Sequence, residues 1–172
     1  MTIKEGWNGR YFEDFELGDV YRHPYGRTIT ETDNIWFTLL TLNTNQLHFN
    51  SHLAERSTWG KPIVNSGLTV ALVLGLSVID VSQNGMANLS WDEIRLPNPV
   101  FVGDTIYAES LVIDLRESKS RPHVGIVSVK TRGLNQDGKV VVTWKRSVMV
   151  YKRDAPMDKG HFPEADVPID AE

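Results

Sequence analysis

Residues 65–80 read NSGLTVALVLGLSVID, and the architecture of the domain follows from this segment. Apolar residues occupy nearly every side of it, which is typical of a helix that is covered on most of its surface. The small residues Gly67, Ala71 and Gly75 recur at every fourth position and form a bare stripe along one side. A glycine within a helix costs roughly 1 kcal/mol relative to alanine. The stripe therefore predicts that a sheet or another backbone packs closely against this helix.

The half of the chain after this helix is rich in Val, Ile, Thr and aromatic residues, which favour strands. Strands are predicted at residues 86–95, 104–115, 123–132 and 139–152. Residues 135–138, Asn-Gln-Asp-Gly, predict a hairpin turn between the last two strands, because the Asp-Gly pair favours tight turns. Helices followed by consecutive strands indicate an α+β domain. One long central helix wrapped by a curved antiparallel sheet is the simplest arrangement that buries every apolar face.

Shorter elements are predicted before the central helix. Residues 25–30 are expected to form a short strand. Thr30 and Asp33 resemble a capping box, in which the side chain of each residue bonds to the backbone N–H of the other, so a helix is expected to start there. A second short helix is predicted at residues 51–56, after a polar loop.

Length and composition indicate one folded domain. The chain has 172 residues, enough for one well-buried core and too few for two ordinary domains. We therefore expect a single domain at residues 1–152 and a polar, proline-containing tail at residues 153–172. Hydrophobic residues make up 41% and charged residues 23%, as in ordinary globular proteins. The net charge of −4 is offset by no basic stripe, which argues against a nucleic-acid-binding protein.

The residue types that are missing exclude several classes of site. The chain contains no cysteine, which excludes a disulfide scaffold, a thiolate nucleophile and a cysteine zinc site. The histidines lack metal-ligand spacing and no glycine-rich phosphate-binding pattern occurs, so neither a metal nor a nucleotide cofactor is predicted. The N-terminus lacks the apolar part of a signal peptide, and the longest apolar run, residues 68–81, is shorter than the ~20 residues of a membrane span. We expect a cytoplasmic protein that does not enter the membrane.

Two neighbouring stretches carry the candidate chemistry. Residues 42–50 (LNTNQLHFN) place His48 in a loop among amide and hydroxyl side chains, and residues 60–67 (GKPIVNSG) lead directly into the central helix. Asn65 and Ser66 are favoured residue types at the start of a helix. The free N–H groups and the positive dipole end at such a start can hold an oxyanion. A proton-transfer residue beside an oxyanion site suits chemistry next to a thioester carbonyl.

These stretches resemble the MaoC-like dehydratase family, which includes the (R)-specific enoyl-CoA hydratases. The family pattern Gly-Asp-x-Asn-Pro-Leu/Ile-His-x-Asp corresponds to residues 42–50, and Phe-Gly-x-Pro-Ile-Val-His-Gly corresponds to residues 59–66. A third pattern, Pro-Val-x-x-Gly-Asp-Thr, corresponds to residues 99–105, and the resemblance covers residues 11–152. It implies a hot-dog fold, assembly as a homodimer or a higher homo-oligomer, and CoA or carrier-protein thioesters as substrates.

The chain departs from this family at the catalytic pair. The resemblance implies that His48 transfers the proton, but Asn43 stands where the family has its catalytic aspartate. An amide cannot take up the proton, so Asn43 is expected to hold a water by its carbonyl oxygen or to donate to an incipient hydroxide. With the segments at 95–105 and 117–127, the chain resembles the branch of the family that hydrates itaconyl-, mesaconyl- or methylmalyl-type CoA esters.

Six residues are candidates for binding the substrate. The candidates are Asn45, Asn65, Ser66, Gly67, Arg95 and Arg121. Backbone N–H groups of Ser66 and Gly67 are expected to polarise the thioester carbonyl. Arg95 and Arg121 are candidates for a substrate carboxylate or the CoA phosphates, because arginine binds both by charge-assisted contacts. Each candidate also has a plainer interpretation, since asparagines form turns and helix caps, and most arginines are solvated.

The sequence therefore predicts a carbon–oxygen lyase that adds water to, or removes it from, the double bond of an enoyl-CoA. No cofactor is expected, because CoA is part of the substrate. Two alternatives remain open. A hot-dog thioesterase would share the fold and direct a water at the carbonyl carbon instead. A non-catalytic acyl-CoA-binding subunit is suggested by the missing aspartate.

Overall fold

The computed structural model describes residues 2, 4, 6–156, 162–163 and 165–169. Its first elements are η1 (Phe12–Asp14), β1 (Val20–Arg22), β2 (Arg27–Thr28), α1 (Glu31–Leu40), η2 (Gln46–His48) and α2 (Ser51–Ala54). The central helix α3 (Ser66–Ser77) continues into the π-helical turn η3 (Val78–Ser82). The long strands are β3 (Gly85–Arg95), β4 (Thr105–Glu117), β5 (Val124–Leu134) and β6 (Val140–Tyr151).

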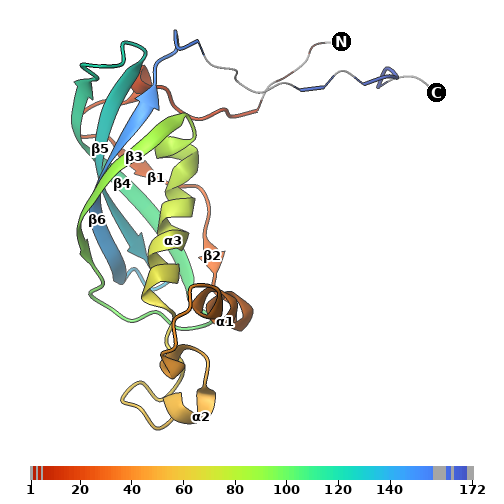
Figure 1. The fold of residues 1–172 in the computed structure, drawn as a ribbon, viewed down its shortest axis with the longest axis vertical. Helices are drawn as coiled ribbons and strands as arrows, with labels where there is room; N and C mark the ends of the chain where they lie inside the picture. The colour runs from red at the N-terminus through yellow and green to blue at the C-terminus, as the bar shows by residue number, and fades with distance from the viewer. Residues whose placement is uncertain (1, 3, 5, 157–161, 164, 170–172) are drawn as a thin grey trace.

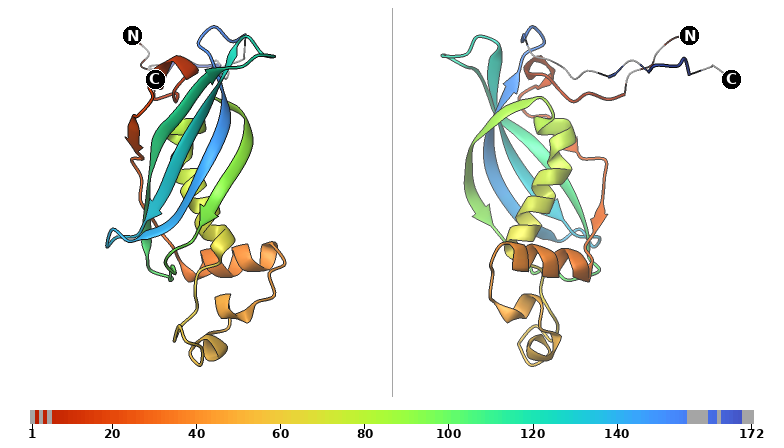
Figure 2. Two further views of the ribbon diagram at one scale, coloured as in Figure 1. Left: turned by 90° about the vertical axis from the view of Figure 1, so that its left-hand side faces the viewer. Right: turned by 45° about the vertical axis from the view of Figure 1, so that its right-hand side comes forward.

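The strands form a curved antiparallel sheet around α3. Their order is β1-β4-β5-β6-β3, and β2 also pairs with β4. Figures 1 and 2 show α3 lying along the concave side of the sheet, with α1 and α2 at one end and the connection between β4 and β5 at the other. This arrangement confirms the predicted α+β class and the central helix wrapped by a curved antiparallel sheet.

The core lies between α3 and the sheet. The buried residues of α3 are Thr69, Val73, Leu76 and Ser77. Val73 and Leu76 pack in one apolar cluster with residues of β4 and β6, including Ile106, Val142 and Trp144. Burying one such side chain fully contributes about 1.5–3 kcal/mol. The apolar face of the helix therefore fixes α3 along the sheet and determines where both of its ends lie.

The stripe of small residues does not pack against the sheet, so the prediction of a closely packed sheet is wrong, and the alternative of another backbone stays a prediction. Gly67, Ala71 and Gly75 are all exposed. A Cβ added at Gly75 would meet no atom within 4 Å, whereas one added at Gly67 would come within 3.2 Å of Phe37 in α1. Larger residues of α3 face the sheet instead, because they fill its concave side without leaving voids. In one chain the stripe is thus a free face of the helix.

Most predicted boundaries agree with the structure. The four long strands lie within two residues of their predicted positions. The capping box is confirmed, because Thr30 Oγ1 accepts from the N–H of Asp33 at 3.2 Å and the Asp33 carboxylate accepts from the N–H of Thr30 at 2.8 Å. The second helix, α2, is shorter than predicted, and the short strand β1 was missed.

The chain beyond β6 is held to the body at its start. The backbone N–H of Arg153 donates to the Glu13 carboxylate at 3.2 Å, and Ala155 is buried. The predicted boundary between a domain at 1–152 and a tail stays a prediction. Residues 157–161, 164 and 170–172 of that tail lie outside the described residues. None of the helices in the described part of the chain is both long and apolar enough to cross a membrane.

Candidate active site

The buried polar side of α1 organises the site. Asn34 is 1% exposed and Thr38 is fully buried, one helical turn apart. The Asn34 amide donates to the backbone carbonyls of His48 at 2.8 Å and Ile63 at 3.2 Å. Its carbonyl oxygen accepts from the N–H of Asn65 at 2.8 Å. One side chain thus ties the loop that carries His48 to the segment that starts α3.

His48 lies at the end of η2 and is 7% exposed. Its Nδ1 is 3.0 Å from the carbonyl oxygen of Ile63. A carbonyl only accepts hydrogen bonds, so Nδ1 carries the proton and Nε2 has a free lone pair. Within the described residues Nε2 has no hydrogen-bond partner. His48 is therefore held in the tautomer that a general base requires.

His48 lines a pocket of about 240 Å³. The other lining residues are Glu31, Asn34, Phe49, Ser51, Lys61, Pro62 and Val102. Glu31 supplies a carboxylate at the first position of α1, and the Lys61 ammonium lies 4.3 Å from the centre of the Phe101 ring. The pocket thus contains an imidazole, one carboxylate and one ammonium, a set of groups suited to proton transfer.

The N-terminus of α3 is fixed by Asn65, the residue before its first turn. The carbonyl oxygen of the Asn65 side chain accepts from the N–H of Gly67 at 2.9 Å, and its amide donates to Thr38 Oγ1 at 3.1 Å. The capping role of Asn65 is confirmed, since the side chain satisfies one free N–H of the helix. It leaves Ser66 N–H, which has no acceptor in the described part of the chain, as the available donor. The expected pair of donors is therefore reduced to one unless Asn65 moves.

Asn43 and Asn45 hold the loop that carries His48 in shape. The carbonyl oxygen of the Asn43 side chain accepts from the N–H of Asn45 at 2.9 Å, and that of Asn45 accepts from Leu47 N–H at 3.1 Å. Such bonds over two residues are Asx turns. The carbonyl oxygen of Asn43 thus has one of its two lone pairs engaged, and its amide group has no hydrogen-bond partner among the described residues. Both predicted roles for Asn43, accepting from a water and donating to a water or hydroxide, stay predictions.

Comparisons with known proteins identify the family. A family model described as mesaconyl-CoA hydratase matches residues 3–172. The chain belongs to the mesaconyl-CoA hydratase family. It is 39% identical over 158 residues to a mesaconyl-CoA hydratase of Cereibacter sphaeroides, covering 91% of this chain and 46% of that protein. The chain thus spans about half the length of the curated relatives it matches.

Solved structures of other proteins place this family among the hot-dog folds. A putative MaoC domain protein dehydratase from Chloroflexus aurantiacus superposes with a TM-score of 0.83 at 35% identity, covering 94% of this chain and 46% of that one. A Mycobacterium tuberculosis protein described as a double hotdog fold superposes with a TM-score of 0.79, covering 94% of this chain and 52% of that one. At 24% identity, this second likeness shows the fold alone. The hot-dog fold and the MaoC-like resemblance are confirmed.

The two arginines predicted to bind substrate lie at opposite ends of the fold. Arg95 ends β3 and is exposed, and β3 runs toward the end of the molecule where α1 lies. Arg121 lies in the connection between β4 and β5, at the far end. It lines a second pocket, of about 300 Å³, together with His123, Met86 and Tyr151. Within one chain the structure does not bring Arg121 to His48.

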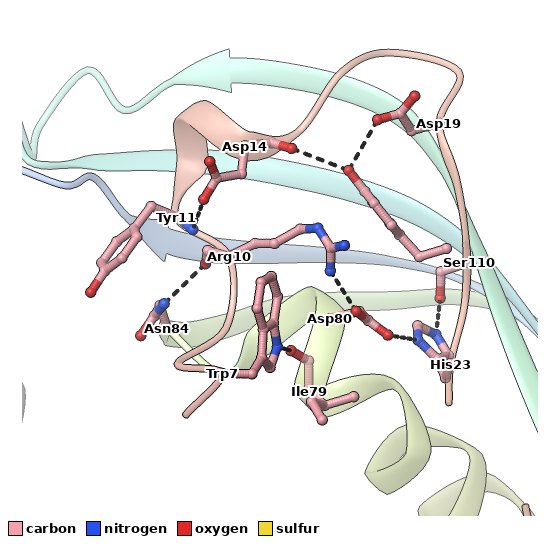
Figure 3. Close-up of polar contacts among 11 residues, drawn as sticks. Trp7, Arg10, Tyr11, Asp14, Asp19, His23, Ile79, Asp80, Asn84 and Ser110 are labelled. Atoms are coloured by element: carbon pink, nitrogen blue, oxygen red, sulfur yellow. Dashed lines mark hydrogen bonds and ion pairs between the residues drawn. The ribbon is translucent and has the colours of Figure 1, made fainter. Parts of the chain in front are cut away.

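A second histidine site, at the far end of α3, was missed by the sequence analysis. His23 Nδ1 is 2.8 Å from the Asp80 carboxylate, and His23 Nε2 is 3.0 Å from Ser110 Oγ (Figure 3). Arg10 also pairs with Asp80, and Ser110 Oγ bonds to Thr131 Oγ1 at 2.8 Å. His23 and Asp80 are 57 residues apart, so no local pattern could have shown this pair.

The order Ser110–His23–Asp80 resembles a nucleophilic triad, but its environment argues against catalysis. Ser110 is 0% exposed, so no substrate reaches its hydroxyl. Burial lowers the pKa of His23, against the opposing effect of Asp80, so the imidazole is neutral at neutral pH. Both ring nitrogens of His23, both carboxylate oxygens of Asp80 and the Ser110 hydroxyl have partners within the chain. The cluster therefore ties the N-terminal segment, β1 and η3 together.

Within the described residues, no group of three or more His, Asp or Glu side chains is arranged to hold a metal ion.

Proposed function

We propose that this chain hydrates the double bond of an enoyl-CoA thioester, or dehydrates the corresponding hydroxyacyl-CoA. The observation that carries the proposal is His48, whose Nδ1 is bonded to the Ile63 carbonyl and which lines a pocket together with Lys61 and Pro62, in the segment that leads into α3. A short branched or dicarboxylic acyl group is proposed because the relative from C. sphaeroides is a mesaconyl-CoA hydratase.

Each group of the site has a role in this reaction. The thioester carbonyl accepts a hydrogen bond from Ser66 N–H, where the positive end of the helix dipole stabilises negative charge on oxygen. His48 Nε2 takes a proton from water, and the hydroxide adds to the β-carbon. The enolate that forms is held at the helix start. The imidazolium then returns its proton to the α-carbon, so that one water is added on one face.

Asn43 and Glu31 supply the groups that the usual aspartate would supply. The amide group of Asn43 donates to the attacking water and orients it, while one lone pair of its carbonyl oxygen holds the turn. Glu31 is a carboxylate lining the same pocket as His48. We further propose that no cofactor takes part, because the thioester itself makes the α-proton acidic. A cytoplasmic location belongs to the same proposal, because acyl-CoA esters are intracellular metabolites.

A panel of enoyl-CoA esters that includes dicarboxylic members tests this function. Hydration removes the ultraviolet absorbance of the conjugated double bond and releases no thiol. The thioesterase alternative predicts release of free CoA thiol from saturated and unsaturated esters alike. If the wild type turns over none of these esters above the background of a His48→Ala variant, the alternative of a non-catalytic acyl-CoA-binding subunit remains, which the replacement of aspartate by Asn43 favours.

We also propose that two copies pair along β3. This strand is an edge of the sheet, pairing only with β6 among the described strands. Leu89, Trp91 and Ile94 on it are each more than 40% exposed. A long, apolar free edge is a template for pairing with another strand. A Trp91→Lys variant is expected to sediment as a monomer, whereas a dimer of unchanged affinity would contradict this pairing.

A further inference from the structure

A charged side chain, that of Arg146, lies inside the core of the fold. Arg146 is a residue of β6 and is 1% exposed. Residues two apart on a strand share one face, so its neighbours on that face are Trp144 and Val148. Trp144 belongs to the apolar cluster that contains Val73 and Leu76 of α3, and Val148 belongs to a second apolar cluster. The guanidinium is therefore enclosed by the core and not solvated at the surface.

Most of the hydrogen-bonding capacity of Arg146 is unused within the chain. Its Nη2 donates to Ser77 Oγ, at the end of α3, at 3.3 Å. Its Nε and Nη1 are buried without a partner among the described residues, and so is Trp144 Nε1 on the same face of β6. Nearly all buried polar groups in proteins have a hydrogen-bond partner. Because these three atoms are all donors, their partner must be an acceptor.

The charge of Arg146 is not compensated by a neighbouring carboxylate. Burial lowers its pKa to about 10, so the guanidinium stays charged at neutral pH. Within the part of the chain that the structure describes, Arg146 forms no ion pair. The carbonyl end of α3 supplies only partial negative charge. A buried cation without a counter-charge is strongly destabilising, so an anion is favoured beside Arg146.

The neighbouring cluster at His23 does not supply that counter-charge (Figure 3). One carboxylate oxygen of Asp80 pairs with Arg10, and the other lies 2.8 Å from His23 Nδ1. His23 itself is neutral, because burial lowers its pKa against the effect of Asp80, and the positive charges of Arg146 and Arg10 lower it further. This part of the core thus holds two guanidiniums and one carboxylate, and it has an excess of positive charge.

The size of the ligand follows from where Arg146 lies. Arg146 lines neither the pocket at His48 nor the pocket at Arg121. A ligand therefore reaches it when the core opens locally, which admits a small ion more readily than an acyl-CoA. A water molecule would accept a hydrogen bond but would bring no charge. A small anion supplies both the acceptor and the counter-charge.

We propose that Arg146 binds a small monovalent inorganic anion in the core, at the C-terminal end of α3. The free nitrogens Nε and Nη1 lie on different edges of the planar guanidinium, so the anion accepts from one of them and a water serves the other. The anion stabilises the folded state, because it binds there and not to the unfolded chain. This site is separate from the hydratase chemistry, since His48 lies at the opposite end of α3.

Thermal unfolding in two sodium salts of equal ionic strength tests the proposal. Chloride is small enough to enter the core, whereas gluconate is too large. The quantity measured is the melting temperature in chloride minus that in gluconate. General salt effects contribute to this difference alike in wild type and variants, so the variants reveal the part that is due to the site.

Arg146→Met removes the charge and keeps an apolar side chain in the core, a type of replacement that is often neutral or stabilising. The difference between the two salts should be about 3–6 °C larger in wild type than in this variant, once chloride exceeds its dissociation constant about tenfold. Lys145→Gln is the matched control, because it removes a positive charge from the adjacent residue, which pairs with Glu93 on the opposite face of β6. The control should behave as wild type. The proposal is overturned if Arg146→Met keeps the wild-type difference or if Lys145→Gln loses it.

A direct measurement on the wild type does not depend on how any variant folds. Bromide replaces chloride in such sites, and its anomalous scattering locates it in crystals grown in sodium bromide. A bromide within hydrogen-bonding distance of Arg146 Nε or Nη1 would support the proposal. Bromide bound only at surface side chains, as adventitious ions, would show that water alone serves the guanidinium and would refute the anion site.

Discussion

The two ends of α3 each carry a buried histidine, and they differ in what is left unpaired. At the C-terminal end, both ring nitrogens of His23 are bonded, to Asp80 and Ser110. At the N-terminal end, His48 is bonded through Nδ1 alone and lines a pocket. His23 is 6% exposed and His48 is 7% exposed, so the degree of burial does not distinguish the two histidines. A free lone pair facing a pocket distinguishes a reactive histidine from a structural one.

The largest expected effect comes from exchanging the two histidines for alanine. His48→Ala should lower kcat by about 10²-fold or more, because a positioned general base contributes about that much. His23→Ala should leave kcat within a few-fold and lower the melting temperature, because Asp80 Oδ2 loses its buried partner and Ser110 keeps only its bond to Thr131. Rates and thermal unfolding of both variants check the contrast. A greater loss of kcat in His23→Ala than in His48→Ala would reverse our assignment.

A smaller effect is expected at Asn34, which supports the reactive end. Asn34→Ala removes the bonds to His48, Ile63 and Asn65, and leaving such buried groups unpaired costs about 1–3 kcal/mol each. Because His48 then loses its fixed position, kcat should fall by about tenfold while KM changes less. Denaturant unfolding and steady-state kinetics measure the two effects. Ser51→Ala, in the same pocket without these bonds, is the control for stability.

His23, at the C-terminal end of α3, should make the stability of the protein depend on pH. The pKa of His23 is lowered by burial, with Arg146 and Arg10 adding to the effect and Asp80 opposing it. Below about pH 6.5 His23 becomes protonated in the unfolded chain but stays neutral in the folded chain. The free energy of unfolding therefore falls as the pH falls. One group changes the unfolding free energy by at most about 1.4 kcal/mol per pH unit. His23→Gln should weaken this dependence between pH 7.5 and 5.5, and an unchanged slope would contradict the lowered pKa.

The two ends also differ in how far the sequence could predict them. Residues 42–50 and 60–67 are short motifs, so the stretches that form the site around His48, at the N-terminal end of α3, could be located without a structure. Their internal bonds could not. The carbonyl oxygen of Asn43 is used in a turn, and Asn34 joins both stretches from 14 and 31 residues away along the chain. The cluster around His23 depends on contacts between residues that lie 57 and 87 positions apart in the chain, which no local pattern encodes.

The strands were predicted better than the helix surface, for a physical reason. The alternation of apolar residues along β5 and β6 reflects only that one face of each strand is more buried than the other. It predicted the ends of both strands to within two residues. The stripe on α3 was misassigned because small residues permit close packing without requiring it. Which side of an apolar helix faces the sheet depends on the summed volume of its neighbours, which the sequence of the helix alone does not contain.

The smallest expected effect is at Asn43. Asn43→Ala removes an Asx turn and one amide donor, and the loop keeps the bond from Asn43 N–H to the carbonyl of Thr38 at 3.0 Å. We expect a loss of kcat of a few-fold, smaller than for Asn34→Ala.

The pH–rate profile shows whether Glu31 contributes, because Glu31→Gln should then remove an acidic limb. A profile with only one ionisation, identical in both proteins, would exclude Glu31 as the second group.

The π-helical turn that ends α3 constrains how the gene can change length. The segment η3 (Val78–Ser82) bonds each residue five positions on, one more than an α-helix does. Removing one residue there would restore α-helical spacing and rotate Asp80 about 100° around the axis, away from His23 and Arg10. Residues 58–60 are exposed, and among the described residues the hydrogen bonds from their backbone N–H groups run only to the nearby Ser57. In-frame deletion of a single codon should therefore leave the protein folded when it falls in that loop and should prevent folding when it falls in η3.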